Sequence, residues 1–180
     1  MKKYDCVFLD RDGTINPDPG YIKNLKSFKF YEFLFPALKK ISEVCDKFCI
    51  VSNQSGVARG LIQKRNIYKI NKYIFEQFNL NKIQLVDIYV CFDHPGNPTR
   101  RRKPGPGMFL EAEEYHDISL PNSLMIGDSL CDMRAGKNLG MDTMLVLTGN
   151  GQETKSKLIH PDLPTYTVGN LIEGANKICH

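Results

Sequence analysis

The sequence predicts one α/β domain, a doubly wound parallel sheet flanked by helices, formed by residues 1–180. Short apolar runs of strand length recur along the chain, and segments of helical periodicity lie between them. The runs are continuous rather than alternating, which is typical of buried parallel strands. No Pro- or Gly-rich linker divides the chain, and its 180 residues suit a single hydrophobic core.

Each expected element is justified by its local pattern. The expected strands are residues 6–9, 48–52, 86–92, 123–127 and 143–147. The expected helices are residues 33–45, 63–79, 106–116 and 130–139. In segment 63–79, apolar residues recur at spacings of three and four, as on one face of a helix: Ile67, Ile70, Ile74 and Phe78. We expect residues 166–178 to finish the fold as a short strand and helix with no site of their own. No large insertion follows the first or second strand, so we predict no large cap domain.

Composition narrows the class of protein. The chain is 42% apolar and 24% charged, which is ordinary for a globular domain, and its net charge is +4. This excess of positive charge suits an anionic substrate, but it is too small and too scattered along the chain for a nucleic-acid-binding domain. No stretch approaches the roughly 20 apolar residues that a membrane span needs, and no signal-peptide pattern opens the sequence. We therefore expect a cytoplasmic monomer with reduced cysteines, of which Cys6, Cys45 and Cys49 are buried thiols.

Polar residues follow four of the expected strands. The sequence DRDGT occupies residues 10–14, SNQSG residues 52–56, RRRKPGPG residues 100–107 and GDSLCD residues 127–132. Ligands of doubly wound sheets bind at the carboxyl ends of the strands. We therefore expect the side chains of these segments to converge on one site.

The converging residue types suit phosphoryl transfer. The carboxylates of Asp10, Asp12 and Asp128 repel one another unless a proton or cation intervenes, and Mg²⁺ prefers such oxygen ligands. Lys103 and Ser52 add a cation and a hydroxyl for phosphate oxygens. Any one of these residues alone is more often a turn, a helix cap or a solvated charge. The whole set, in order and at strand ends, favours an active site.

The four motifs resemble those of the haloacid dehalogenase superfamily of phosphatases. Longer stretches, FLDRDGTIN, GYI, SNQSGVARG, RKPGPGM and IGDSLCDM, are similar to the D,D-heptose 1,7-bisphosphate phosphatase branch, whose relatives include histidinol-phosphatases. The similarity covers about residues 4–150. NQSGVARG together with GYI favours the heptose branch. Asp12 favours a phosphatase over a dehalogenase, because an ester leaving group needs an acid and a halide does not.

The resemblance implies a role for each matching residue. Asp10 attacks phosphorus, and Asp12 protonates the leaving oxygen and then activates water. Asp10, the backbone carbonyl of Asp12 and Asp128 hold Mg²⁺, while Ser52 and Lys103 stabilise the phosphoryl group. The implied substrate-binding residues are Asp18, Gly20, Tyr21, Ser52, Asn53, Gln54, Ser55, Arg59, Arg102 and Lys103.

The sequence departs from the branch after the third strand. Relatives usually carry four Cys and His ligands for zinc there, whereas this chain keeps only Cys91 and His94. Structural zinc sites are almost always four-coordinate, so we expect no zinc. Ser129 also stands where the family often has Lys after the metal-binding aspartate. Both changes fall where substrate choice is expected to be set.

The resulting hypothesis is an Mg²⁺-dependent phosphatase of a small phosphorylated sugar. The expected reaction removes the C7 phosphate of D-glycero-D-manno-heptose 1,7-bisphosphate, in precursor synthesis for a surface polysaccharide such as lipopolysaccharide. One alternative is a histidinol-phosphatase or another small-molecule phosphatase. An alternative of another class is an inactive binding protein, against which intact Asp10, Asp12, Lys103 and Asp128 argue. We expect neither a nucleic-acid nor a membrane partner.

Overall fold

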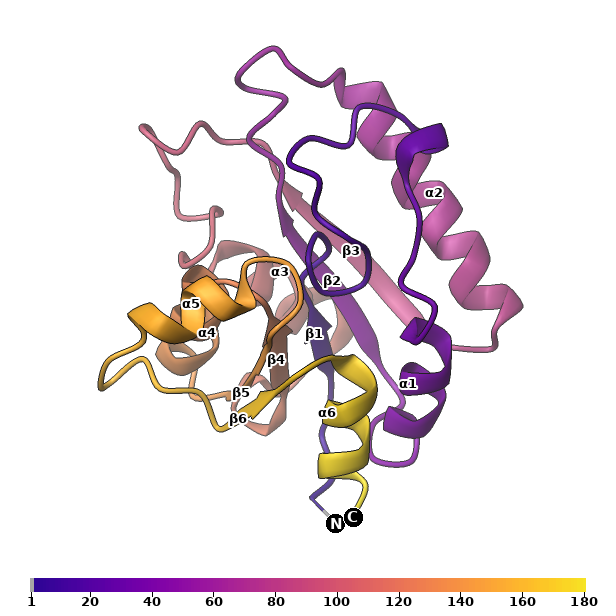
Figure 1. Cartoon of the computed structure of the whole chain (residues 1–180), viewed down its shortest axis with the longest axis vertical. Coiled ribbons are helices and arrows are strands. Elements are labelled where there is room, and N and C mark those ends of the chain that lie inside the picture. The colour runs from indigo at the N-terminus through magenta and orange to yellow at the C-terminus, as the bar shows by residue number, and fades with distance from the viewer. Residues whose placement is uncertain (1) are drawn as a thin grey trace.

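The computed structural model describes residues 2–180 and contains a six-stranded parallel sheet (Figure 1). Its strands are β1 (Val7–Leu9), β2 (Phe48–Asn53), β3 (Leu85–Cys91), β4 (Leu124–Gly127), β5 (Asp142–Val146) and β6 (Tyr166–Val168). Their order across the sheet is β3-β2-β1-β4-β5-β6. The first strand, β1, lies in the centre; β2 and β3 extend the sheet to one edge, and β4, β5 and β6 extend it from β1 to the other edge. This arrangement confirms the predicted doubly wound sheet.

Helices cover both faces of the sheet (Figure 1). One face packs against α1 (Leu34–Ile41), α2 (Lys64–Leu80) and α6 (Leu171–Ile178), and the other against α3 (Gly107–His116) and α4 (Leu130–Asn138). The remaining elements are α5 (Gly151–Lys157) and the short 3₁₀ turns η1 (Leu25–Ser27) and η2 (Leu120–Asn122). Side chains of β1 alternate between the two cores, with Val7 and Leu9 in one and Phe8 in the other.

Helices α1 and α5 differ most from the sequence prediction. The helix expected over residues 33–45 ends at Ile41, after which the chain continues in turns; the Ser42 hydroxyl donates to the Leu38 carbonyl at 2.9 Å, a local bond that competes with helix propagation. Helix α5 was not predicted, because its sequence GQETKSK has no apolar periodicity and buries only Gly151 and Thr154. The short C-terminal strand and helix were predicted and are present as β6 and α6.

The cysteines follow the expectation for a protein without disulfides. All six are free thiols, and Cys6, Cys45 and Cys49 are buried. Within residues 2–180, no helix combines the length and apolar character that crossing a bilayer requires.

The register of the central strands brings the polar motifs together. Leu9 at the end of β1 pairs with Ile50 of β2 and with Ile126 of β4. Asp10 therefore follows β1 beside the last residues of β2 and β4, at the carboxyl edge of the sheet.

Candidate active site

A cleft of about 420 Å³ lies at this edge of the sheet. It is lined by Asp10, Asp12, Asp18, Gly20, Tyr21, Ser52, Asn53, Gln54, Ser55, Gly56, Arg102, Lys103, Asp128, Ser129, Cys131 and Asn150. Every site residue predicted from the sequence is among them except Arg59, which is exposed in the turn after β2. The structure thus brings all four motifs to one place.

Lys103 is a buried cation in the wall of the cleft, with only 3% of its surface exposed. Its Nζ donates to Asp10 Oδ1 at 2.7 Å and to the Val51 carbonyl at 2.7 Å, and it forms an ion pair with Asp132 Oδ1 at 2.6 Å. Burial alone lowers the pKa of a lysine, but the carboxylates of Asp10 and Asp132 raise that of Lys103 above its ordinary value. The ammonium group therefore stays charged and fixes one oxygen of Asp10.

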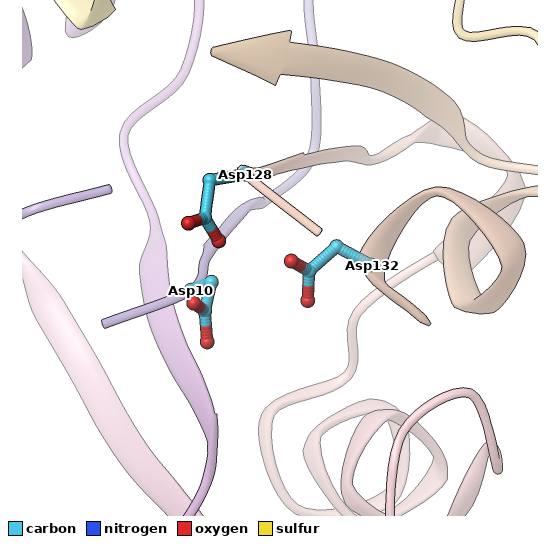
Figure 2. A group of neighbouring side chains, drawn as sticks. All are labelled: Asp10, Asp128 and Asp132. Carbon is cyan, nitrogen blue, oxygen red and sulfur yellow. The ribbon is translucent and has the colours of Figure 1, made fainter. Parts of the chain in front are cut away.

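Three carboxylates surround a common space beside Lys103. Asp10 follows β1, Asp128 follows β4 and Asp132 lies in the first turn of α4, with carboxylate oxygens within 4.8 Å of one another (Figure 2). Burial and the charge of Asp132 raise the pKa of Asp128 to about 7, and burial also raises the pKa of Asp10, although Lys103 opposes it. A hard divalent cation relieves this repulsion, and Mg²⁺ takes oxygen ligands of this kind. The donor set therefore fits magnesium.

Asp132 is the member of this group of three carboxylates that the sequence analysis did not assign. It is the second aspartate of GDSLCD, but only Asp128 was assigned. Its Oδ2 accepts from the Ser129 backbone at 3.1 Å and from the Ser129 hydroxyl at 2.5 Å, as in a capping box, while Oδ1 pairs with Lys103. The signal was present in the sequence, since an acidic residue three positions after a strand-end Ser is typical of a helix N-terminus.

Asp12 occupies a separate environment on the same loop. Its Oδ1 accepts from Arg11 Nε at 3.1 Å and Asn16 Nδ2 at 2.9 Å; its Oδ2 accepts from Arg11 Nη2 at 2.7 Å and Gln54 Nε2 at 2.8 Å. Burial raises the pKa of Asp12, but the Arg11 guanidinium and these hydrogen bonds bring it below its ordinary value. Asp10 and Asp12, two residues apart, thus have pKa values moved in opposite directions, because Asp10 is desolvated beside other carboxylates and Asp12 is paired with a guanidinium.

The loop after β5 holds Asp128 in place, a role that the sequence did not predict. Asn150 donates to Asp128 Oδ2 from its backbone at 2.7 Å and from its side chain at 3.3 Å. Gly13 (φ +84°) and Gly149 (φ +54°) approach the same carboxylate so closely that a Cβ on either would collide with it. Glycine is required at both positions by space as well as by backbone conformation.

Two of the predicted substrate-binding residues have their amide groups engaged within the protein. Asn53 accepts from the Lys103 backbone N–H and donates to the Lys103 carbonyl, both at 3.1 Å. Gln54 donates to Ser52 Oγ at 2.7 Å as well as to Asp12. Both side chains also line the cleft, where each is hydrogen-bonded to another cleft residue.

Cys91 and His94 are the two residues that this chain keeps of the four usual zinc ligands. His94 Nδ1 accepts from the Gly96 backbone at 3.1 Å, and Cys91 is buried at the end of β3. Within residues 2–180, Asp10, Asp128 and Asp132 form the only group of three or more acidic, His or Cys side chains close enough to share a metal. That zinc is not bound stays a prediction.

A doubly wound sheet with a lysine-held aspartate and an acidic group at its carboxyl edge defines a hydrolase like those of the haloacid dehalogenase superfamily. Residues 100–174 match the family described as HAD-hydrolase-like. The fold agrees with a solved structure, the D,D-heptose 1,7-bisphosphate phosphatase of B. bronchiseptica complexed with magnesium and phosphate, at a TM-score of 0.87 and 27% identity over 97% of each chain. The nearly complete coverage of both chains is consistent with a fold that has no cap domain.

Curated relatives specify the family further. The D-glycero-beta-D-manno-heptose-1,7-bisphosphate 7-phosphatase of Escherichia coli O6:H1 is 35% identical over 82% of each chain. The D-glycero-alpha-D-manno-heptose-1,7-bisphosphate 7-phosphatase of Campylobacter jejuni is 34% identical over 84% of this chain and 87% of its own. The chain belongs to the heptose-1,7-bisphosphate 7-phosphatase family and is a phosphatase.

Proposed function

We propose that this chain is an Mg²⁺-dependent phosphomonoesterase that removes the C7 phosphate from D-glycero-D-manno-heptose 1,7-bisphosphate through a phosphorylated Asp10. The observation that carries the proposal is that two neighbouring carboxylates, those of Asp10 and Asp12, have different hydrogen-bond partners. The Asp10 carboxylate accepts from Lys103 at 2.7 Å and lies beside Asp128 and Asp132. The Asp12 carboxylate instead accepts from Arg11, Asn16 and Gln54. We assign the Asp10 carboxylate as the nucleophile and the Asp12 carboxyl as the acid and base.

In the first step, a carboxylate oxygen of Asp10 forms a bond to phosphorus and the bond from phosphorus to the sugar oxygen breaks. Asp12, whose pKa the negative charge of the bound phosphate raises, gives its proton to that oxygen, and the Ser52 hydroxyl and Lys103 ammonium hold the phosphoryl oxygens. In the second step, Asp12 takes a proton from water as the water oxygen bonds to phosphorus and Asp10 leaves. When bound by Asp10, Asp128 and the Asp12 backbone carbonyl, Mg²⁺ supplies charge neutralisation.

Asp132 contributes by orienting the lysine. Its ion pair with Lys103 at 2.6 Å holds the ammonium in place when the Asp10 carboxyl loses its charge on phosphorylation. In this account Asp132 is a positioning residue, and Asn53 fixes the backbone of the same lysine.

The heptose substrate is supported by the relatives, which include enzymes named for the alpha and for the beta anomer at nearly equal identity. Arg102 on the wall of the cleft supplies a cation for an anionic sugar. We further propose that residues 1–180 act as one cytoplasmic, monomeric domain in the synthesis of heptose precursors for surface polysaccharides.

The test is phosphate release with Mg²⁺ from both anomers of the bisphosphate and from histidinol phosphate, with ³¹P NMR to show which phosphate leaves. We expect loss of the C7 phosphate and a preference in kcat/KM of about 100-fold for one heptose anomer over histidinol phosphate, equivalent to about 2.7 kcal/mol. Comparably feeble rates on all three compounds would contradict the heptose assignment and leave another phosphate ester as substrate.

A further inference from the structure

The segment between β3 and α3 must be ordered for the site to work, although residues 92–106 form neither strand nor helix. It carries Arg102 and Lys103 into the cleft. Loops of this length without secondary structure are uncommon in compact domains and are usually either functional or disordered. Some contact must therefore fix the path of the chain ahead of Arg102.

The structure shows such a contact between Asp93 and Thr99, hereafter the Asp93–Thr99 clamp. Asp93 Oδ2 accepts from the Thr99 backbone N–H at 2.7 Å and from the Thr99 hydroxyl at 2.6 Å. Both bonds end on one carboxylate oxygen, and they hold the pKa of Asp93 below its ordinary value. Hydrogen bonds to a charged acceptor are stronger than neutral ones.

Both members of the clamp contact Arg102. The Arg102 backbone N–H donates to the Thr99 carbonyl at 3.2 Å, and Arg102 Nη1 donates to the Asp93 carbonyl at 3.3 Å. The Thr99 hydroxyl also accepts from the Arg101 backbone at 3.2 Å. The backbone and the guanidinium of Arg102 are thus tied to the two residues that the clamp joins.

Lys103 is held by other groups. Asn53 fixes its backbone, and Asp10 and Asp132 fix its ammonium. Loosening the clamp therefore releases Arg102 more than Lys103. The two neighbouring cations are positioned by separate sets of contacts, which gives an experiment a way to separate them.

We propose that the Asp93–Thr99 clamp positions Arg102 for substrate binding, so that Thr99 and Asp93 are positioning residues of this phosphatase. The inference rests on the role proposed above for Arg102. It does not depend on which phosphate ester is the natural substrate.

The test measures KM and kcat of the full-length Mg²⁺ enzyme with the phosphate ester that the wild type hydrolyses best. Thr99→Val removes the hydroxyl and keeps the shape, and we expect KM to rise about fivefold, in the range for loss of a hydrogen bond, with kcat within twofold. Thr99→Ser restores the hydroxyl and should restore KM. His94→Ala is the matched control on the same loop, since its imidazole accepts from Gly96 and makes no hydrogen bond to Arg102 within residues 2–180.

A double-mutant cycle tests whether Thr99 acts through Arg102. Arg102→Ala should raise KM, and adding Thr99→Val to it should change KM no further. Additive effects of the two changes, an unchanged KM in either single variant, or failure of Thr99→Ser to restore binding would overturn the proposal. An increase in KM for His94→Ala equal to that for Thr99→Val would also overturn it, because the loop would then be held by His94.

Trypsin gives a second readout that involves no substrate. The loop contains Arg100, Arg101 and Arg102, and cleavage there requires the chain to leave its ordered path. We expect Thr99→Val to be cut in this loop several times faster than the wild type, Thr99→Ser or His94→Ala. Equal cleavage rates would contradict the clamp itself. The failure of the heptose assignment would instead appear only in the choice of substrate.

Discussion

Replacement of Lys103 by Met should destabilise the metal-free protein strongly, because it leaves two buried carboxylates without their cation. Lys103 is 3% exposed and lies 2.7 Å from Asp10 and 2.6 Å from Asp132. Removing one partner of a buried pair costs about 3–5 kcal/mol in other proteins. At about 2–4 °C per kcal/mol for a chain of this size, we expect the Tm to fall by about 6–20 °C.

The assay is thermal unfolding followed by circular dichroism, in EDTA, from pH 5.5 to pH 8.5. Burial already raises the pKa of Asp10, and loss of Lys103 removes the charge that opposes this rise. A raised folded-state pKa costs stability only where the unfolded carboxyl has ionised, and the cost is complete above the folded-state pKa. The deficit of Lys103→Met should therefore be smaller at pH 5.5 than at pH 8.5.

Lys2→Met is the matched control. Lys2 also forms an ion pair 2.7 Å long, with Asp142, but its side chain is 52% exposed. Exposed pairs contribute at most about 1 kcal/mol, so this variant should change the Tm by no more than a few degrees at any pH. If Lys103→Met lost no more stability than Lys2→Met, or lost as much at pH 5.5 as at pH 8.5, the reasoning about Lys103 would be refuted.

Three further variants test the groups around the cleft. Asp128→Asn should stabilise the metal-free protein more at pH 8 than at pH 4. The folded-state pKa of Asp128 is raised to about 7, so the wild type loses stability as the pH rises from about 4, where the unfolded carboxyl ionises, to about 7, where the loss is complete. Urea unfolding in EDTA checks this, and an equal gain at pH 4 and pH 8 would contradict it. Gly149→Ala should destabilise the fold by about 2–3 kcal/mol and weaken Mg²⁺ binding measured by calorimetry, because the added Cβ meets the Asp128 carboxylate. Gly140→Ala is the control: its φ is similar and no atom lies nearer than 3.9 Å, so it should lose only about 1 kcal/mol and bind Mg²⁺ normally. Gln54→Leu removes one donor from Asp12 and should lower kcat about tenfold with little change in KM, a split that steady-state kinetics would show; a rise in KM alone would assign this side chain to substrate binding instead.

The fold and most of the cleft could be predicted because the deciding features are local. Continuous apolar runs predict buried parallel strands, and the topology of a doubly wound sheet then places every strand-end motif at one edge. Asp10, Ser52 and Asp128 meet for this reason.

The parts that could not be predicted depend on contacts between distant loops. The contact of Asn150 with Asp128 joins residues separated by two elements, and nothing in the polar sequence GNGQETK reveals it. The engagement of Asn53 with the backbone of Lys103 is hidden in the same way, since a polar residue after a strand indicates the site but not its partner. Arg59 shows the converse: its motif belongs to the site, but its side chain lies outside the cleft.

The most direct test of the account is to trap the phosphate on Asp10. In an Asp12→Asn variant, p-nitrophenyl phosphate still transfers its phosphoryl group, because nitrophenolate leaves without a proton, while hydrolysis lacks its base. If the wild type hydrolyses p-nitrophenyl phosphate, Asp12→Asn should release a burst of about one nitrophenolate per enzyme and yield a phosphorylated peptide that contains Asp10. The double variant Asp10→Asn/Asp12→Asn should show neither the burst nor the phosphorylated peptide. Continuous turnover without a burst, or phosphate on any other residue, would contradict it.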